Sequence, residues 1–145
     1  MKLPENKVFN KPVTFGTKFA ACFDIESTEN VTLFPNKPVA VSTGLFLSDD
    51  MSKYTKQYCY VEILSRSGLS LKGVSVFNAP GIIDMDYRDE IKIILNYVGE
   101  GQYKVSKGDR IAQGNLVELS DSQVNLRNRS NASSTRTGGF GSTGI

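Results

Sequence analysis

The final residues of the chain, Gly138 to Ile145, read GGFGSTGI and combine glycines, hydroxyl side chains and one aromatic ring. Glycine lets a backbone approach a ligand closely, and hydroxyl and bare N–H groups suit phosphate oxygens. Phe140 adds a flat apolar face on which a planar ring can stack. Taken alone, the segment favours the simpler interpretation, an unstructured Gly/Ser end. A role in binding phosphate therefore needs support from the rest of the chain.

A second stretch with similar chemistry, SRSGLSLKG, runs from Ser65 to Gly73 directly after an apolar run. Arg66 offers a guanidinium fork, Ser67 a hydroxyl, and Gly68 an unobstructed backbone N–H, which together suit a phosphate. The same three residue types also occur in ordinary turns. Both interpretations stay open for this stretch by itself.

A third stretch, NAPGIIDMDYRDEIKI, runs from Asn78 to Ile93 and carries paired carboxylates. Asp84 and Asp86 are two residues apart, which places them on one side of an extended chain, and Tyr87 follows a glycine-containing turn. A hairpin of this shape can form a slot for a flat ligand that is bound by backbone groups. The alternative, a β-turn with solvated acids, is favoured when this stretch is considered by itself.

Composition limits the chemistry that these stretches can do. Histidine is absent, which excludes Ser-His and Cys-His catalysis, a histidine base and His-ligated zinc. Any reaction must use carboxylates, hydroxyls, Lys, Arg, Tyr or a loosely held ion. The net charge of +2 is too small for a domain held to nucleic acid by phosphates alone. Cys22 and Cys59 form no Cys-x-x-Cys pair, which favours a cytoplasmic or nuclear setting over a secreted one.

The elements that must position these residues are strands. Apolar residues alternate with polar ones over short runs, as in residues 56–64, where Cys59, Val61 and Ile63 share one face. Turn signals such as Ala79-Pro80-Gly81 separate the runs. The other runs are residues 31–35, 37–47, 90–98 and 108–119. This pattern predicts one all-β sandwich or barrel, with a single helical turn expected at residues 48–54.

Composition changes after Ser120, so we expect a β domain over residues 1–120 and a C-terminal arm over residues 121–145. The arm has few large apolar residues before its glycine-rich end. Fully extended, its first part would reach tens of ångströms at roughly 3.3 Å per residue, far enough to lie on a neighbouring subunit. MKLPENKVFN at the start holds no apolar leader, and no window approaches a membrane span. We therefore expect no membrane association.

Five stretches, in this order, resemble the five motifs of the trimeric dUTPase family (deoxyuridine 5′-triphosphate nucleotidohydrolases). They are AACFDIES, SRSGLSLKG, NAPGIIDMDYRDE, GDRIAQ and RTGGFGSTG. The similarity covers about residues 20–144, and the third and fifth motifs are the specific ones. It implies a distorted jelly-roll or β-barrel with a flexible C-terminal arm. It also implies hydrolysis of dUTP to dUMP and pyrophosphate with Mg²⁺ by a homotrimer with three shared sites. In the family this reaction keeps uracil out of DNA and supplies dUMP for dTMP synthesis.

The resemblance also implies roles for individual residues. Asp84 would orient and deprotonate the water that attacks the α-phosphorus, and in a chain without histidine a carboxylate is the sensible base. Tyr87 would pack under the deoxyribose and exclude a 2′-hydroxyl, and Phe140 would stack on the uracil. Asp24 would act on the metal indirectly, through water. The remaining substrate-binding positions would be Asn78, Gly81, Ile82, Ile83 and Lys92 for the nucleoside, Arg66, Ser67, Gly68 and Gln113 for the phosphates, and Arg136, Gly141, Ser142 and Thr143 for the γ-phosphate.

The chain departs from the family pattern at five positions. Cys22 stands where the first motif usually has glycine, and Ser65 replaces a usual proline. Asp89 replaces a glycine and adds a negative charge, and Gly114 replaces an aliphatic residue. Arg136 lies one residue closer to Phe140 than is usual, so Arg127 or Arg129 is an alternative partner for the γ-phosphate.

Two other functions stay open at this point. A dCTP deaminase shares the fold and motifs but carries a glutamate ten residues after the aspartate, where this chain has Ile94. Without that acid, a histidine or zinc, a deamination has no base. The second alternative is a non-catalytic binding or regulatory protein of this fold, as in some viral or phage relatives. The presence of Asp84, Tyr87 and Phe140 argues against lost catalysis, and a viral or phage origin stays possible.

Overall fold

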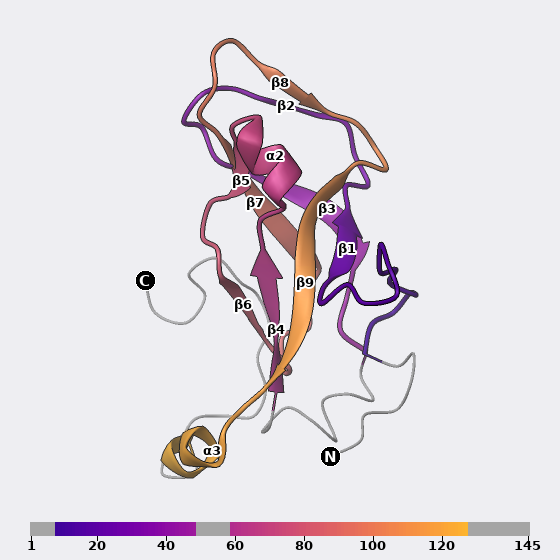
Figure 1. Cartoon of the computed structure of the whole chain (residues 1–145), viewed down its shortest axis with the longest axis vertical. Helices are drawn as coiled ribbons and strands as arrows, with labels where there is room; N and C mark the ends of the chain where they lie inside the picture. Colours follow the sequence, from indigo (N-terminus) through magenta and orange to yellow (C-terminus); the bar gives the residue numbers. More distant parts are fainter. Residues whose placement is uncertain (1–7, 49–58, 128–145) are drawn as a thin grey trace.

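Strands dominate the computed structural model, which describes residues 8–48 and 59–127 (Figure 1). The all-β prediction is confirmed, and most of the strands fall within the predicted runs. The predicted helical turn at residues 48–54 lies almost wholly outside the described residues. In chain order the elements are β1 (Phe23–Glu26), β2 (Val31–Leu33), β3 (Val39–Leu45), β4 (Cys59–Leu64), α2 (Ser67–Leu71), β5 (Val74–Val76), β6 (Gly81–Asp84), β7 (Ile91–Tyr97), β8 (Tyr103–Val105), β9 (Arg110–Glu118) and α3 (Asp121–Arg127).

Two antiparallel sheets form the body of the domain. In one, the order is β1-β9-β4-β6, so that β6 is an edge strand among the described elements. In the other, the order is β3-β7-β5, and a further pair, β2-β8, lies at the end of the molecule beside α2 (Figure 1). Each long central strand, β9 or β7, pairs on both sides and so fixes the position of its neighbours.

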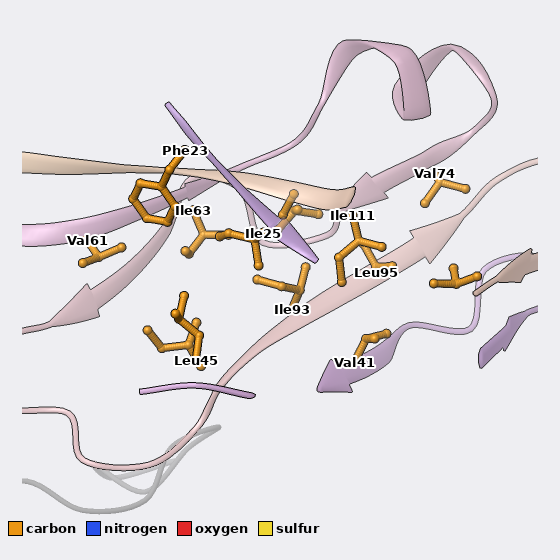
Figure 2. Packing of buried hydrophobic residues seen from close by; sticks show 14 of the residues in the cluster. Phe23, Ile25, Val41, Leu45, Val61, Ile63, Val74, Ile93, Leu95 and Ile111 are labelled. Carbon is orange, nitrogen blue, oxygen red and sulfur yellow. The ribbon is translucent and has the colours of Figure 1, made fainter. Parts of the chain in front are cut away.

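The core lies where the apolar faces of the two sheets meet. β4 alternates buried and half-buried residues along its length, and β7 buries Ile91, Ile93, Leu95 and Tyr97, as the period-two pattern predicts. Figure 2 shows side chains of both sheets, among them Ile63 and Ile93, in this single cluster. A packed core of this kind holds the strand ends, and the loops between them, in fixed relative positions.

The two helices differ from what the residues suggested. The stretch after β4 was expected to be a phosphate-binding segment or an ordinary turn, and no helix was predicted there, but Ser67–Leu71 form the short helix α2, with Arg66 at its N-cap. The first part of the arm forms α3 rather than extended chain, so its reach is shorter than the extended estimate. Ser120 is the N-cap of this helix, because its hydroxyl accepts a hydrogen bond from the N–H of Gln123 at 3.2 Å. None of the helices in the described residues is long and apolar enough to cross a membrane.

Candidate active site

A cavity of about 280 Å³ opens between β6 and β7, and it collects most of the residues predicted to bind the nucleoside. Its wall combines apolar side chains with a small number of polar groups, which is typical of a site for a small organic ligand. Asp84 lies at the end of β6 and contributes a carboxylate. The predicted residues that line the cavity are Asn78, Gly81, Ile82, Ile83, Asp84, Tyr87 and Lys92, and the others are Ile63, Val76, Ile93 and Ile94.

The wall formed by β6 depends on close packing against β4. Gly81 pairs with Ile63, and a Cβ at Gly81 would lie only 3.3 Å from the Cβ of Ile63. Glycine therefore lets the two strands approach at the start of β6. Because β6 pairs with β4 on one side only, its other backbone edge is not paired to a described strand. That edge belongs to the strand that lines the cavity.

Tyr87 and Asp84 are joined by a tight turn that follows β6. The N–H of Tyr87 donates to the carbonyl oxygen of Asp84 at 3.0 Å. Tyr87 is only 8% exposed, and its hydroxyl donates to the carbonyl oxygen of Glu90 at 3.1 Å. Asp84, by contrast, is exposed. The turn thus presents a fixed aromatic ring beside a carboxylate that water can reach.

The two aspartates of the predicted pair do not share this environment. Asp84 lines the cavity, whereas Asp86 does not and is half-buried. The carbonyl oxygen of Asp86 accepts the Nε–H of Arg88 at 3.3 Å. Only one of the two carboxylates is therefore placed to act on a ligand in the cavity.

A second polar cluster surrounds Asp24 on β1. Its carboxylate lies 3.7 Å from Nε of Arg66 and 3.9 Å from Nη1 of Arg110. Arg66 also donates through Nη1 to the carbonyl oxygen of Arg110 at 3.2 Å, so its guanidinium is held from two sides. Gln113 is the register partner of Asp24, and its Nε2 donates to the carbonyl oxygen of Ser65 at 2.9 Å. The cluster joins the first, second and fourth predicted motifs.

This cluster, which we name the arginine cluster (Asp24, Arg66, Arg110 and Gln113), has the properties of an anion site. A polar cavity of about 340 Å³ beside it is lined by Arg66, Lys72 and Arg110, among others. Ser67 and Gly68 are exposed in the first turn of α2, and a Cβ at Gly68 would meet no atom within 4 Å. The backbone there is open to a ligand.

Two residues that line this polar cavity, Arg110 and Lys72, were not among the predicted site residues. Arg110 forms an ion pair with Asp24 rather than with its sequence neighbour Asp109. The carboxylate of Asp109 instead accepts the N–H of Ser106 at 2.8 Å. The usable signal was their position in the motifs, since Arg110 lies inside GDRIAQ and Lys72 inside SRSGLSLKG.

The described residues offer no dedicated metal cage. No group of three or more His, Cys, Asp or Glu side chains there is arranged to hold an ion. Asp24 already faces two guanidinium groups. This donor set fits a Mg²⁺ ion held mainly by phosphate oxygens and water, which is the usual preference of that ion. The predicted residues of the fifth motif, Arg136, Phe140, Gly141, Ser142 and Thr143, lie outside the described residues.

Known proteins resemble this chain in sequence. Residues 11–144 match the family model of dUTPases. A deoxyuridine 5′-triphosphate nucleotidohydrolase of Wolinella succinogenes is 40% identical over 126 residues, which cover 86% of this chain and 80% of that protein. The enzyme of the same name from Helicobacter pylori (strain P12) is 36% identical over 132 residues, covering 90% and 87%.

Solved structures of similar fold carry the same family name. The dUTPase of Streptococcus mutans superposes with a TM-score of 0.64 at 21% identity, covering 74% of this chain and 84% of that one. A mutant dUTPase from phage phi11 of S. aureus, described with a structural Mg(II) ion, superposes with a TM-score of 0.62 at 22% identity, covering 75% and 84%. The chain therefore belongs to the dUTPase family and is an enzyme of nucleotide metabolism, a dUTP diphosphatase.

Proposed function

We propose that the chain hydrolyses dUTP to dUMP and pyrophosphate by attack of water on the α-phosphorus, with Mg²⁺ as cofactor. The observation that supports this most directly is the cavity that places the Tyr87 ring beside the Asp84 carboxylate. A nucleoside in the cavity would leave its phosphates near the exposed end of β6. In the cell, the reaction would keep uracil out of DNA and supply dUMP for dTMP synthesis.

Recognition of the nucleoside would use the edge of β6. Uracil offers alternating acceptors and one donor, which backbone groups of Ile82 and Ile83 can complement, with Asn78 and Lys92 at the rim. The Tyr87 ring would lie under the deoxyribose. Its burial and its hydroxyl hydrogen bond support a fixed position, which exclusion of a 2′-hydroxyl requires.

Asp84 would act as the general base. Its carboxylate accepts a proton from the attacking water while a new oxygen–phosphorus bond forms at the α-phosphorus. The bond from that phosphorus to the bridging oxygen breaks, and pyrophosphate leaves. Asp24 would hold Mg²⁺ indirectly, through water, and the ion would supply neutralisation of the phosphate charge when bound. The exposure of Asp84 supports this role, because the attacking water must reach it.

The arginine cluster would bind the phosphates. Arg66, with the hydroxyl of Ser67 and the open backbone at Gly68, provides charge-assisted donors, and Gln113 adds an amide. Asp24 and Arg110 hold the guanidinium of Arg66 in place, so that its side chain would lose less conformational entropy when phosphate binds. Phe140 would stack on uracil, and Arg136 with residues 141–143 would close over the γ-phosphate.

We also propose a homotrimer in which each site is shared between subunits. The nucleoside cavity and the polar cavity at the arginine cluster have no lining residue in common within one chain. Light scattering should give three times the chain mass. Mixed oligomers of Asp84→Asn and Arg66→Gln chains should regain activity that neither variant has alone, because some sites then receive both wild-type residues. A monomeric active enzyme would contradict the shared site.

Pyrophosphate release from dUTP in the presence of Mg²⁺ is the test of the proposed reaction. Asp84→Asn should bind nucleotide but lose about 10²–10⁴-fold in kcat, since an amide cannot accept the proton. Asp86→Asn is the matched control, and it should keep its activity because Asp86 does not line the cavity. A loss below tenfold for Asp84→Asn at saturating Mg²⁺ would assign the base to another group.

The preference for dUTP over UTP tests the proposed role of the Tyr87 ring. Tyr87→Ala should narrow the difference between dUTP and UTP, because a smaller side chain leaves room for the 2′-hydroxyl. An equal loss with both substrates would make the ring structural only.

The relatives bear on where the reaction would take place. The curated relatives named above are bacterial; they do not support a nuclear setting, and a bacterial cytoplasm is the compartment that we propose. The phage phi11 protein resembles the chain at an identity that shows the fold alone, so it does not support a phage origin.

A further inference from the structure

Glu90, directly before β7, uses its side chain to fill a gap in the β3–β7 ladder. The register of this pair shifts between Val41 and Leu45, so the strand bulges there. Within the bulge, the N–H groups of Thr43 and Gly44 donate to Oε2 of Glu90 at 3.2 and 2.8 Å. One carboxylate oxygen thus replaces the backbone acceptors that the interrupted ladder lacks.

The bulge is itself fixed from its other sides. Thr43 is 1% exposed, and its hydroxyl donates to the carbonyl oxygen of Ile91 and accepts the N–H of Leu45 at 3.1 Å. Lys11 Nζ donates to the carbonyl oxygen of Thr43 at 2.6 Å. Gly44 has a φ of +65°, a conformation that suits glycine. The bulge is therefore a firm point of attachment for Glu90.

Glu90 also accepts a hydrogen bond from Tyr87, the aromatic residue of the candidate site. Its carbonyl oxygen receives the hydroxyl hydrogen bond of Tyr87. Tyr87 lines the nucleoside cavity, whereas Glu90 does not. A continuous chain of hydrogen bonds therefore connects the bulge of β3, through Glu90, to the Tyr87 ring in the cavity.

We propose that Glu90 is a positioning residue that sets the place of Tyr87 in the cavity and thereby the preference for a deoxyribonucleotide over a ribonucleotide. The inference rests on the proposed function, in which Tyr87 faces the sugar. Exclusion of one hydroxyl is a steric effect, so a small shift of the ring changes it strongly. A displacement of about 1 Å at a site can cost up to about 10²-fold in rate.

The test compares kcat/KM for dUTP and for UTP in the full-length enzyme. Glu90→Ala should lower the ratio of kcat/KM for dUTP to kcat/KM for UTP by about tenfold, because the turn that carries Tyr87 loses its hydrogen bonds to the β3 bulge. We expect kcat/KM for UTP to rise, or to fall less than kcat/KM for dUTP. Glu90→Gln keeps an acceptor oxygen and should restore most of the ratio. Tyr87→Phe removes the hydroxyl contact alone and should lower the ratio in the same direction.

Glu100 provides a matched control. Its carbonyl oxygen accepts the hydroxyl of Tyr97 at 2.8 Å, with the same three-residue spacing as Tyr87 and Glu90. Glu100 is exposed, and neither it nor Tyr97 lines the nucleoside cavity. Glu100→Ala should leave the ratio unchanged. A fall of similar size in this control would show a general loss of stability and would overturn the inference.

The outcomes separate the inference from the function on which it rests. If Tyr87→Ala leaves the dUTP/UTP ratio unchanged, the proposed sugar contact is wrong. If Tyr87→Ala lowers the ratio but Glu90→Ala leaves it unchanged, only the positioning role is wrong. Should Glu90→Ala fail to fold, Glu90→Asp decides: it keeps the charge but is too short to reach the bulge, and an unchanged ratio in it overturns the inference.

Discussion

Gly114 should be one of the least replaceable residues in the core, although a glycine inside a strand is unfavourable in general. It lies on β9 opposite Phe23, and an added Cβ would lie 2.4 Å from Cζ and 2.7 Å from Cε2 of that ring. The ring cannot swing away easily, because it is 4% exposed and packs edge-on against Phe9 and Phe15. The departure from the family's aliphatic residue is thus explained by the bulk of Phe23.

The magnitude follows from the cost of overpacking. Gly114→Ala should destabilise the fold by about 1–3 kcal/mol. For a chain of this size that corresponds to a fall in Tm of roughly 2–12 °C. Thermal unfolding without nucleotide, at one fixed protein concentration, measures it. Gly16→Ala is the control, because its Cβ would meet only Asp24 Oδ2 at 3.8 Å, and its Tm should stay near that of the wild type.

A second substitution identifies the clash. Phe23→Leu removes the ring atoms that the new Cβ would meet, so the double variant should be destabilised by less than the sum of the two single variants. A coupling of about 0.5–3 kcal/mol is expected for residues in contact. Additive effects, or a Gly114→Ala protein as stable as the wild type, would refute the argument. If β9 moves instead of the ring, the neighbouring Gln113 shifts and KM for dUTP rises.

Three further predictions follow from the site and the free thiol. Phe140→Ala should lower kcat/KM by about ten- to a hundredfold, since stacking on a base is worth about 1–3 kcal/mol; normal kinetics would remove the ring from the site. Ile94→Glu places a carboxylate on the cavity wall and should lower kcat/KM for dUTP about tenfold or more without producing ammonia from dCTP; ammonia release would revive the deaminase alternative. Burial, and secondarily the charge of Glu62, raises the pKa of the Cys22 thiol. In a Cys59→Ser background, alkylation of Cys22 near neutral pH should therefore be slower in the folded than in the unfolded chain, and it should be faster in Glu62→Gln. Equal rates would contradict the shift in pKa.

Periodicity predicted the strands well because burial on one face leaves a readable pattern. β7 follows it along its whole apolar face, from Ile91 to Tyr97. The sequence positions of Asn78, Asp84 and Tyr87 predicted that they lie close together, and all three line one cavity, because they lie on β6 or within a few residues of it. The contacts of Asp24 were not predictable from local sequence. They depend on the pairing of β1, near the start of the chain, with β9, near the end of the β domain.

The helices were missed for a different reason. α2 spans five residues and includes Gly68, so its formation depends on the surrounding fold rather than on its own propensity. α3 has only Val124 and Leu126 as large apolar residues, which are too few to show a helical period in the sequence. The pair Ser120 and Gln123 did carry a signal, since serine followed three residues later by glutamine is a capping-box pattern.

The edge position of β6 has a consequence for how the enzyme would tolerate change. In the proposed pose, uracil is read by main-chain atoms of Ile82 and Ile83, and every residue except proline supplies the same N–H and C=O groups. Side chains at these two positions can therefore drift among apolar types while base recognition persists. For an inhibitor that mimics uracil, resistance by substitution there is difficult, because only proline would delete the main-chain donor, and it would delete that donor for uracil as well.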